Sequence, residues 1–81
     1  MNYFDLWIEY TGGLRAVMIR NLKSDIECGY DPQGAACRAQ AAAIREHDNN
    51  ISEALALFRT LPDAAINHYC RFDLLRRGAI A

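Results

Sequence analysis

The chain has no long apolar run. None of its segments reaches the roughly 18 consecutive apolar residues that a membrane-spanning helix needs. It also has no leader in which positive charges precede a short apolar stretch, so we expect neither a membrane span nor a secretory signal. Arginine far outnumbers lysine and alanine is abundant, a bias typical of GC-rich bacterial or phage genes. These features predict a cytoplasmic protein of a bacterial host cell.

An excess of charge of either sign is missing too. The 81 residues carry 10 acidic and 9 basic side chains, for a net charge of −1. This balance excludes a strongly basic nucleic-acid-binding protein and a wholly acidic mimic of DNA. Acidic residues predominate in residues 1–34 and basic residues in residues 54–81, a mild polarity that an ordinary solvated surface also shows.

Cysteine is scarce and irregularly spaced. Cys28, Cys37 and Cys70 are an odd number in a chain without a secretory signal, which favours reduced thiols over a disulfide scaffold. There is no Cys-x-x-Cys pair, and His47 and His68 do not stand at zinc-finger spacing from the cysteines. His68 and Cys70 are two positions apart, so on a helix they point to different faces. We therefore expect no metal site.

Catalytic signatures are absent as well. The sequence has no nucleophile elbow, no P-loop and no dinucleotide-binding fingerprint. Cys70 with His68 or His47 is a conceivable nucleophile and base, but nothing marks an activated thiol or an oxyanion loop. We expect a protein that is not an enzyme and that holds no cofactor.

What the sequence does contain is an opening segment with a clear alternation. Residues 3–10 are rich in aromatic side chains and place an apolar one at every second position, which predicts a half-buried strand. Gly12-Gly13 follows and predicts a hairpin turn, because glycine adopts the positive φ angles that tight reversals need. One face of the predicted strand carries Phe4, Leu6, Ile8 and Tyr10, and the other carries Tyr3, Asp5, Trp7 and Glu9.

The next segments fit two patterns each. Residues 14–20 match a strand and a helical stripe equally well. We favour a strand, because the first strand would otherwise have both edges unpaired. Residues 21–30 predict a third strand, and the alternative is a helical turn opened by Ser24 and Glu27 at capping-box spacing.

Helical signals fill the second half of the chain. Asp31 as N-cap and Pro32 at the first helical position open a predicted alanine-rich helix that ends at residues 48–50. A second helix is expected to end at Leu61-Pro62, and a third to run from Pro62 to a C′ glycine, Gly78. The expected buried stripes are Ile51, Ala54, Leu55 and Phe58 in the second helix and Ile66, Tyr69, Cys70 and Leu74 in the third.

The predicted fold is therefore α+β, in a single domain of residues 1–81. A β-hairpin or three-stranded antiparallel sheet in residues 1–30 would pack against about three helices in residues 31–78. Strands come first and helices follow, which argues against alternating βαβ units and a parallel sheet.

Candidate partner-binding residues gather on the outward face of the predicted sheet. Aromatic side chains flanked by acids are typical of protein-interface anchors, and Trp7 and Tyr3 would provide them. The carboxylates would meet lysine or arginine side chains that otherwise hold phosphate. The alternative is that Trp7 packs beneath a helix or a loop. The full candidate set is Tyr3, Asp5, Trp7, Glu9, Glu27 and Asp31.

Two other hypotheses stay open. The first is a small nucleic-acid-binding or regulatory module that contacts phosphate through Arg59, Arg71, Arg76 and Arg77. Arg76 and Arg77 serve equally well at a helix C-terminus, where cations are favourable against the helix dipole. The second is a homodimer formed through the sheet edge or the alanine-rich helix.

One resemblance extends over residues 3–45. A predicted hairpin carrying Ile8-Glu9-Tyr10 and Gly12-Gly13 leads through residues 29–36, Gly-Tyr-Asp-Pro-Gln-Gly-Ala-Ala, into the alanine-rich helix. In plan, this is similar to the small anti-CRISPR proteins encoded by phages and mobile elements, several of which pair a short antiparallel sheet with a few helices. The resemblance implies an inhibitor that binds the nucleic-acid-binding subunits of a type I CRISPR surveillance complex and blocks target DNA without catalysis. These proteins share no sequence motif, so it assigns no residue a role.

Overall fold

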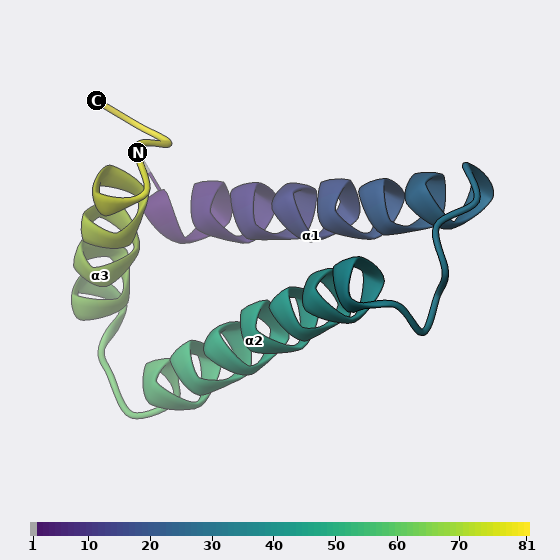
Figure 1. Cartoon of the computed structure of the whole chain (residues 1–81). Helices are drawn as coiled ribbons and strands as arrows, with labels where there is room; N and C mark the ends of the chain where they lie inside the picture. Colours follow the sequence, from purple (N-terminus) through teal and green to yellow (C-terminus); the bar gives the residue numbers. More distant parts are fainter. Residues whose placement is uncertain (1) are drawn as a thin grey trace.

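The protein, described by a computed structural model over residues 2–81, is built from three α-helices (Figure 1). α1 spans Tyr3–Glu27, α2 spans Ala35–Phe58 and α3 spans Asp63–Arg76. α2 returns beside α1, and α3 packs against the end of the molecule where α1 begins. The described residues contain no strand. The predicted α+β fold is therefore wrong, and residues 3–27, expected to form a sheet, form one helix instead.

α1 begins at an N-cap that the period-two pattern conceals. The side chain of Asn2 accepts hydrogen bonds from the backbone N–H groups of Phe4 and Asp5, at 3.0 and 3.4 Å. Asp5 adds a carboxylate in the first turn, where the helix dipole favours negative charge. Trp7 and Thr11, four residues apart, are buried on the same side of the helix. Helical spacing therefore decides which side chains face the core.

The Gly12-Gly13 pair lies inside α1 and makes no turn. Within the described residues, positive φ angles occur only at Gly29 and Gly78. A glycine in a helix interior costs about 1 kcal/mol relative to alanine. A Cβ atom at either Gly12 or Gly13 would meet nothing within 4 Å. The packing of this chain therefore does not require a glycine at either position.

α1 ends where the third strand was expected, in a Schellman motif. Gly29 has a φ of 103°, and its N–H donates to the carbonyl of Ile26. The N–H of Tyr30 reaches back to the carbonyl of Asp25 at 3.0 Å. These two bonds satisfy carbonyls that the helix end would otherwise leave unpaired.

α2 is one helix where two were predicted. It starts at Ala35 with Gly34 as N-cap, and it continues through residues 48–50, the predicted break, to Phe58. Asp31, the predicted N-cap, lies before the helix, and its side chain accepts a hydrogen bond from Gln33 N–H at 2.9 Å. Asp48 is compatible with the middle of α2 because its carboxylate accepts a hydrogen bond from Arg15 of α1 and so does not compete for the helix backbone.

α3 confirms the prediction for the last helix. It starts at Asp63 directly after Pro62 and ends at Arg76. Gly78 has a φ of 74° and stands at C′, as predicted, with Ala79 N–H donating to the carbonyl of Leu74. Cys70 and Leu74 face the core, whereas Tyr69 is 36% exposed.

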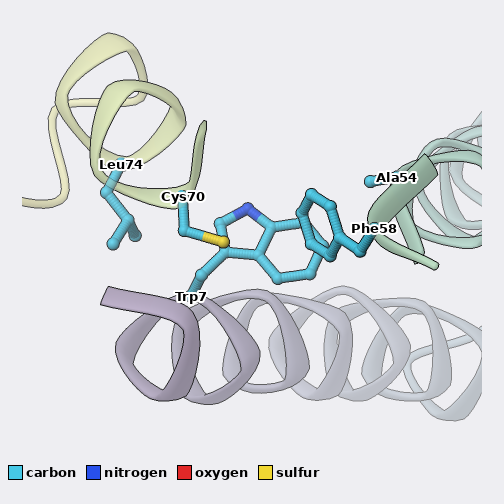
Figure 2. Close-up of a cluster of buried hydrophobic side chains, with 5 residues drawn as sticks. All are labelled: Trp7, Ala54, Phe58, Cys70 and Leu74. Atoms are coloured by element: carbon cyan, nitrogen blue, oxygen red, sulfur yellow. The ribbon is translucent and has the colours of Figure 1, made fainter. Parts of the chain in front are cut away.

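The core lies at the end of the molecule where all three helices meet, which we call the compact end (Figure 2). The ring of Phe58 stands edge-on to Trp7, Phe4 and Tyr69, with centroid distances of 5.4, 6.0 and 5.1 Å. Such edge-to-face pairs are favourable beyond the area they bury. The buried cluster consists of Trp7, Ala54, Phe58, Cys70 and Leu74.

The rest of the helical hairpin, residues 14–47, extends away from this core, and we call it the arm (Figure 1). The molecule measures 47 × 25 × 16 Å with a radius of gyration of 15.3 Å. A compact domain of this length has a radius of gyration of about 12 Å. In the arm only Cys37 and His47 are buried. The elongated shape therefore reflects two helices that run on without a third to cover them.

Candidate binding surfaces

Trp7, the expected surface anchor, is at the centre of the core. Its side chain is 1% exposed, and its indole Nε1 donates a hydrogen bond of 2.8 Å to Asp73 Oδ2. Figure 2 shows the indole between α1 and α3, with Cys70 and Phe58 against it. This arrangement matches the alternative in which Trp7 packs beneath a helix. Trp7 therefore offers no surface to a partner.

Asp73 is the polar centre of the compact end. It is 5% exposed, and besides Trp7 it pairs with two arginines of its own helix end. Arg77 Nε donates to Asp73 Oδ2 at 2.7 Å, and Arg76 Nη2 donates to Oδ1. A buried charge is stable only when it is paired and hydrogen-bonded, and Asp73 meets both conditions. The interactions fix α1 against the C-terminal turn of α3.

Two opposing effects act on the pKa of Asp73. Burial acts to raise the pKa, but the hydrogen bonds from Trp7, Arg77 and Arg76, with the charge of Arg77, outweigh it and lower the pKa below its ordinary value. A carboxyl with a lowered pKa in the folded state stabilises the protein while it is ionised. Asp73 therefore acts as a structural ion that holds Trp7, Arg76 and Arg77 together.

The four arginines proposed to contact nucleic acid do not form a free basic cluster. Arg76 and Arg77 are bonded to Asp73, and the guanidinium of Arg71 lies 5.9 Å from the ring centroid of Tyr3, within cation–π range. Arg59 is exposed at the C-terminal end of α2. Three of the four cations thus have partners inside the chain, which reduces the charge offered to phosphate.

The predicted acidic set is split between two ends of α1. Asp5, Glu9, Glu27 and Asp31 are all exposed. Asp5 and Glu27 are separated by about 33 Å along the helix, at 1.5 Å per residue. Asp31 lies in the loop beyond Glu27. Asp5 and Glu9 therefore cannot act together with Glu27 and Asp31 on one small partner site.

The thiol of Cys70 and the two histidines lie in different surroundings. Burial, followed by the negative charge of Asp73, raises the pKa of the Cys70 thiol to about 11, so the thiol stays protonated at neutral pH. His47 is buried in the arm and His68 is exposed on α3. Within residues 2–81 no three histidine, cysteine or acidic side chains stand close enough together to hold a metal ion.

The most exposed large apolar surface lies on the outer side of α3, and we call it the α3 outer face: Phe72 and Leu75, with Tyr69 at the edge, where its ring also contacts Phe58. Phe72 is 63% exposed, and Tyr69 and Leu75 are 36% and 38% exposed. They recur every third residue, so they share one broad side of the helix. Arg71 and Arg76 flank this side, and arginine beside aromatic residues is the composition of protein interfaces.

A second apolar feature is a hollow of about 840 Å³ at the compact end. Phe4, Leu55, Phe58 and Ile66 form its apolar floor, and Arg59 and Asp63 stand at its edge. The hollow contains no buried polar side chain without a hydrogen-bond partner. It therefore has the shape to accept an apolar group, and its polar lining, which includes Arg59 and Asp63, is not buried without a partner.

The α3 outer face could have been predicted from the sequence. Once Pro62 fixes the start of the helix and Cys70 and Leu74 define its buried side, Phe72 and Leu75 fall on the other side by helical periodicity alone. The signal in the sequence is an aromatic residue, Phe72, at a helical position opposite the buried stripe, whereas the predicted anchors lay on the opening segment.

Comparison of the chain with protein-family models, with curated proteins and with solved structures finds no match. No helix within residues 2–81 is both long and apolar enough to cross a bilayer.

Proposed function

We propose that this chain is a non-catalytic protein-binding module that docks through the α3 outer face. The observation that carries the proposal is the exposure of Phe72, 63% on a helix held in place by the Asp73 interactions. Burying a large apolar side chain against a partner is favourable, because it removes apolar surface from water. Aromatic anchors on rigid helices supply much of the binding energy of interfaces.

The composition of the face defines the partner chemistry. Phe72 and Leu75 fit an apolar pocket, and Arg71 and Arg76 at the flanks fit acidic side chains around that pocket. A nucleic acid fits this face less well than a protein does, because Arg76 is already paired with Asp73 and the centre is apolar.

We propose as the specific partner the type I CRISPR surveillance complex, with this chain as its inhibitor. The small size of the chain and its one exposed anchor support this assignment. The original arguments for this assignment were a β-sheet and an exposed acidic strip around Trp7. They no longer apply, because the described residues contain no strand and Trp7 is buried. In this form of the proposal the chain blocks target DNA by occupying a protein surface and by steric exclusion.

The test compares Phe72→Ala with Tyr30→Ala. Tyr30 is the matched control, because it is an aromatic side chain 56% exposed but lies in the loop between α1 and α2. Affinity for a purified type I surveillance complex is measured by interferometry, and target-DNA binding by gel shift. Loss of a central anchor weakens binding by about 30-fold, the equivalent of 2 kcal/mol. We expect this loss for Phe72→Ala and less than a twofold change for Tyr30→Ala.

Two outcomes would contradict the proposal at different levels. Normal target-DNA binding by the complex in the presence of excess wild-type chain would refute the inhibitor assignment alone. A photoreactive phenylalanine analogue at position 72 tests the docking face itself in the host cell. One defined protein adduct, competed by wild-type chain but not by Phe72→Ala, would support it. A nucleic-acid adduct, or no adduct, would refute it.

A further inference from the structure

A second unpartnered surface lies on α1, turned away from α2 and α3. Its residues recur at intervals of three and four, so they form one continuous stripe. All but one of them are exposed, and none of their charged groups makes an ion pair with another described residue. We call this stripe the α1 outer face: Asp5, Ile8, Glu9, Gly12, Ala16, Ile19, Arg20 and Lys23, in which Ile19 alone is half-buried.

We propose that the α1 outer face pairs with the same face of a second copy, with the two α1 helices antiparallel. The order of charges carries this inference. Asp5 and Glu9 occupy the first half of the stripe, and Arg20 and Lys23 occupy the second half. A helix that is acidic at one end and basic at the other is complementary to itself only when one copy is reversed.

The register follows from the same residues. When the two helices are centred between Gly12 and Ala16, Asp5 of one copy faces Lys23 of the other, and Glu9 lies beside Arg20. In the same register Gly12 faces Ala16 of the second copy, so the backbones can approach closely at the centre. A parallel pairing would instead oppose Asp5 to Asp5 and Lys23 to Lys23, and like charges across an interface are unfavourable.

Apolar contacts accompany the charges. Ile8 is 42% exposed, and in the antiparallel register it lies beside Ile19 of the second copy. The two glycines also support a close second helix. Gly12 and Gly13 weaken α1, yet no atom of this chain lies close enough to exclude a larger side chain there. A close second helix would use that space.

The extent of the contact sets its strength. Residues 5–23 overlap over about 27 Å of helix. Small central side chains bury little area, so the pair falls among small, weak interfaces rather than obligate ones. The α3 outer face stays uncovered in this dimer, because α3 packs on a different side of α1. Each dimer would therefore present two docking faces, and the pairing goes beyond the proposed function without depending on it.

The test uses two charge-reversal variants, one with Asp5→Lys and Glu9→Lys and one with Arg20→Glu and Lys23→Glu. Molecular mass in solution is measured by sedimentation equilibrium, and folding is checked by circular dichroism. At a concentration at which the wild type is dimeric, each variant alone should be monomeric, because its two ends repel those of a second copy. An equimolar mixture should regain the dimer.

The matched control is Glu46→Lys with Glu53→Lys, which makes the same charge change on exposed positions of α2. It should remain dimeric. A bulky Gly12→Leu variant has room in its own chain and should be monomeric while its helix content is retained. The proposal is overturned if the wild type is monomeric up to about 1 mM. It is equally overturned if the mixed variants stay monomeric, or if the α2 control is lost along with the α1 variants.

Discussion

The compact end and the arm of this molecule use the same two helices in different ways. At the compact end α1 and α2 meet α3, and the other four buried side chains of the cluster surround Trp7. Along the arm the two helices have only each other, and Cys37 and His47 are the buried positions. A pair of helices can bury one stripe on each, whereas a third helix encloses a volume.

The polar contacts differ in the same direction. Trp7 and Asp73 form a buried hydrogen bond between residues 66 positions apart in the chain. In the arm Gln40 donates to Asp25, and at its base Arg15 pairs with Asp48 at 2.7 Å on an exposed surface. Exposed ion pairs contribute little to stability. The comparison teaches that global stability resides in the compact end and that the arm opens locally at lower cost.

The largest expected effect is that of Trp7→Ala. Truncating a buried aromatic residue costs about 3–5 kcal/mol. A domain of this length has a total stability of about 4–12 kcal/mol, so the variant should lose much or all of its cooperative unfolding transition. Urea denaturation followed by circular dichroism measures the change. A loss of unfolding free energy below about 1 kcal/mol would contradict the conclusion that global stability resides in the compact end.

The next effect is that of Asp73→Asn, which removes the charge that Arg76 and Arg77 pair with. Leaving buried hydrogen-bonding groups without a full partner costs about 1–3 kcal/mol near neutral pH. Because the pKa of Asp73 is lowered in the folded state, its stabilisation is complete above its unfolded pKa, about 3.9, and is lost as the pH falls through the lower folded value. The two proteins should therefore converge in stability in strong acid. A difference that persists unchanged there would contradict the assignment.

A smaller loss of stability is expected for Met18→Ala, because the side chain of Met18 in the arm is only half-buried. The loss should be about 1 kcal/mol, because only part of the side chain leaves water on folding. Amide hydrogen exchange sharpens the contrast. Amides of residues 35–45 should exchange faster than those of residues 52–58 on the same helix. Equal protection along α2 would show that the arm and the compact end open together.

The smallest effect is expected at the Arg15–Asp48 pair. Hydrogen bonding to Asp48 and its charge raise the pKa of Arg15, and the hydrogen bond from Arg15 lowers the pKa of Asp48, but both side chains are exposed to solvent. Arg15→Gln should leave the urea midpoint within error of the wild type at 150 mM salt, where screening is strong. A clear shift that vanishes in Asp48→Asn would show that the arm depends on this pair.

In the second half of the fold, α3 was predicted correctly but α2 was wrongly divided into two helices, and the first half was predicted wrongly as a sheet. Pro62, the stripe around Cys70 and Gly78 at C′ located α3 correctly, because each signal acts locally. Residues 3–10 satisfy both periods, since eight residues are too few to separate two from 3.6. The longer series of Trp7, Thr11, Leu14 and Met18 has helical spacing and extends beyond the length of an ordinary strand. Asn2 as N-cap was the second signal that the hairpin prediction overlooked.

The candidate site was harder to predict than the fold. The role of Trp7 depends on Asp73, a contact between opposite ends of the chain that no local pattern reveals. Because the opening segment was predicted to be a strand, Trp7 was assigned to its outward face and was taken as the partner-binding anchor. Helical periodicity was enough to place Phe72 on the exposed side of α3, and the structure shows that this side chain is 63% exposed.

Trp7 is the only tryptophan in the sequence, and it is enclosed by the compact end. Its ultraviolet emission is therefore a built-in optical reporter of one half of the molecule. A blue-shifted spectrum should persist while the distal helices fray, and should move to longer wavelength only when the indole loses its carboxylate partner and meets water. When fluorescence and far-ultraviolet dichroism are recorded on the same heated sample, their transition midpoints should differ. The difference in temperature then reports how much the compact end and the arm differ in stability.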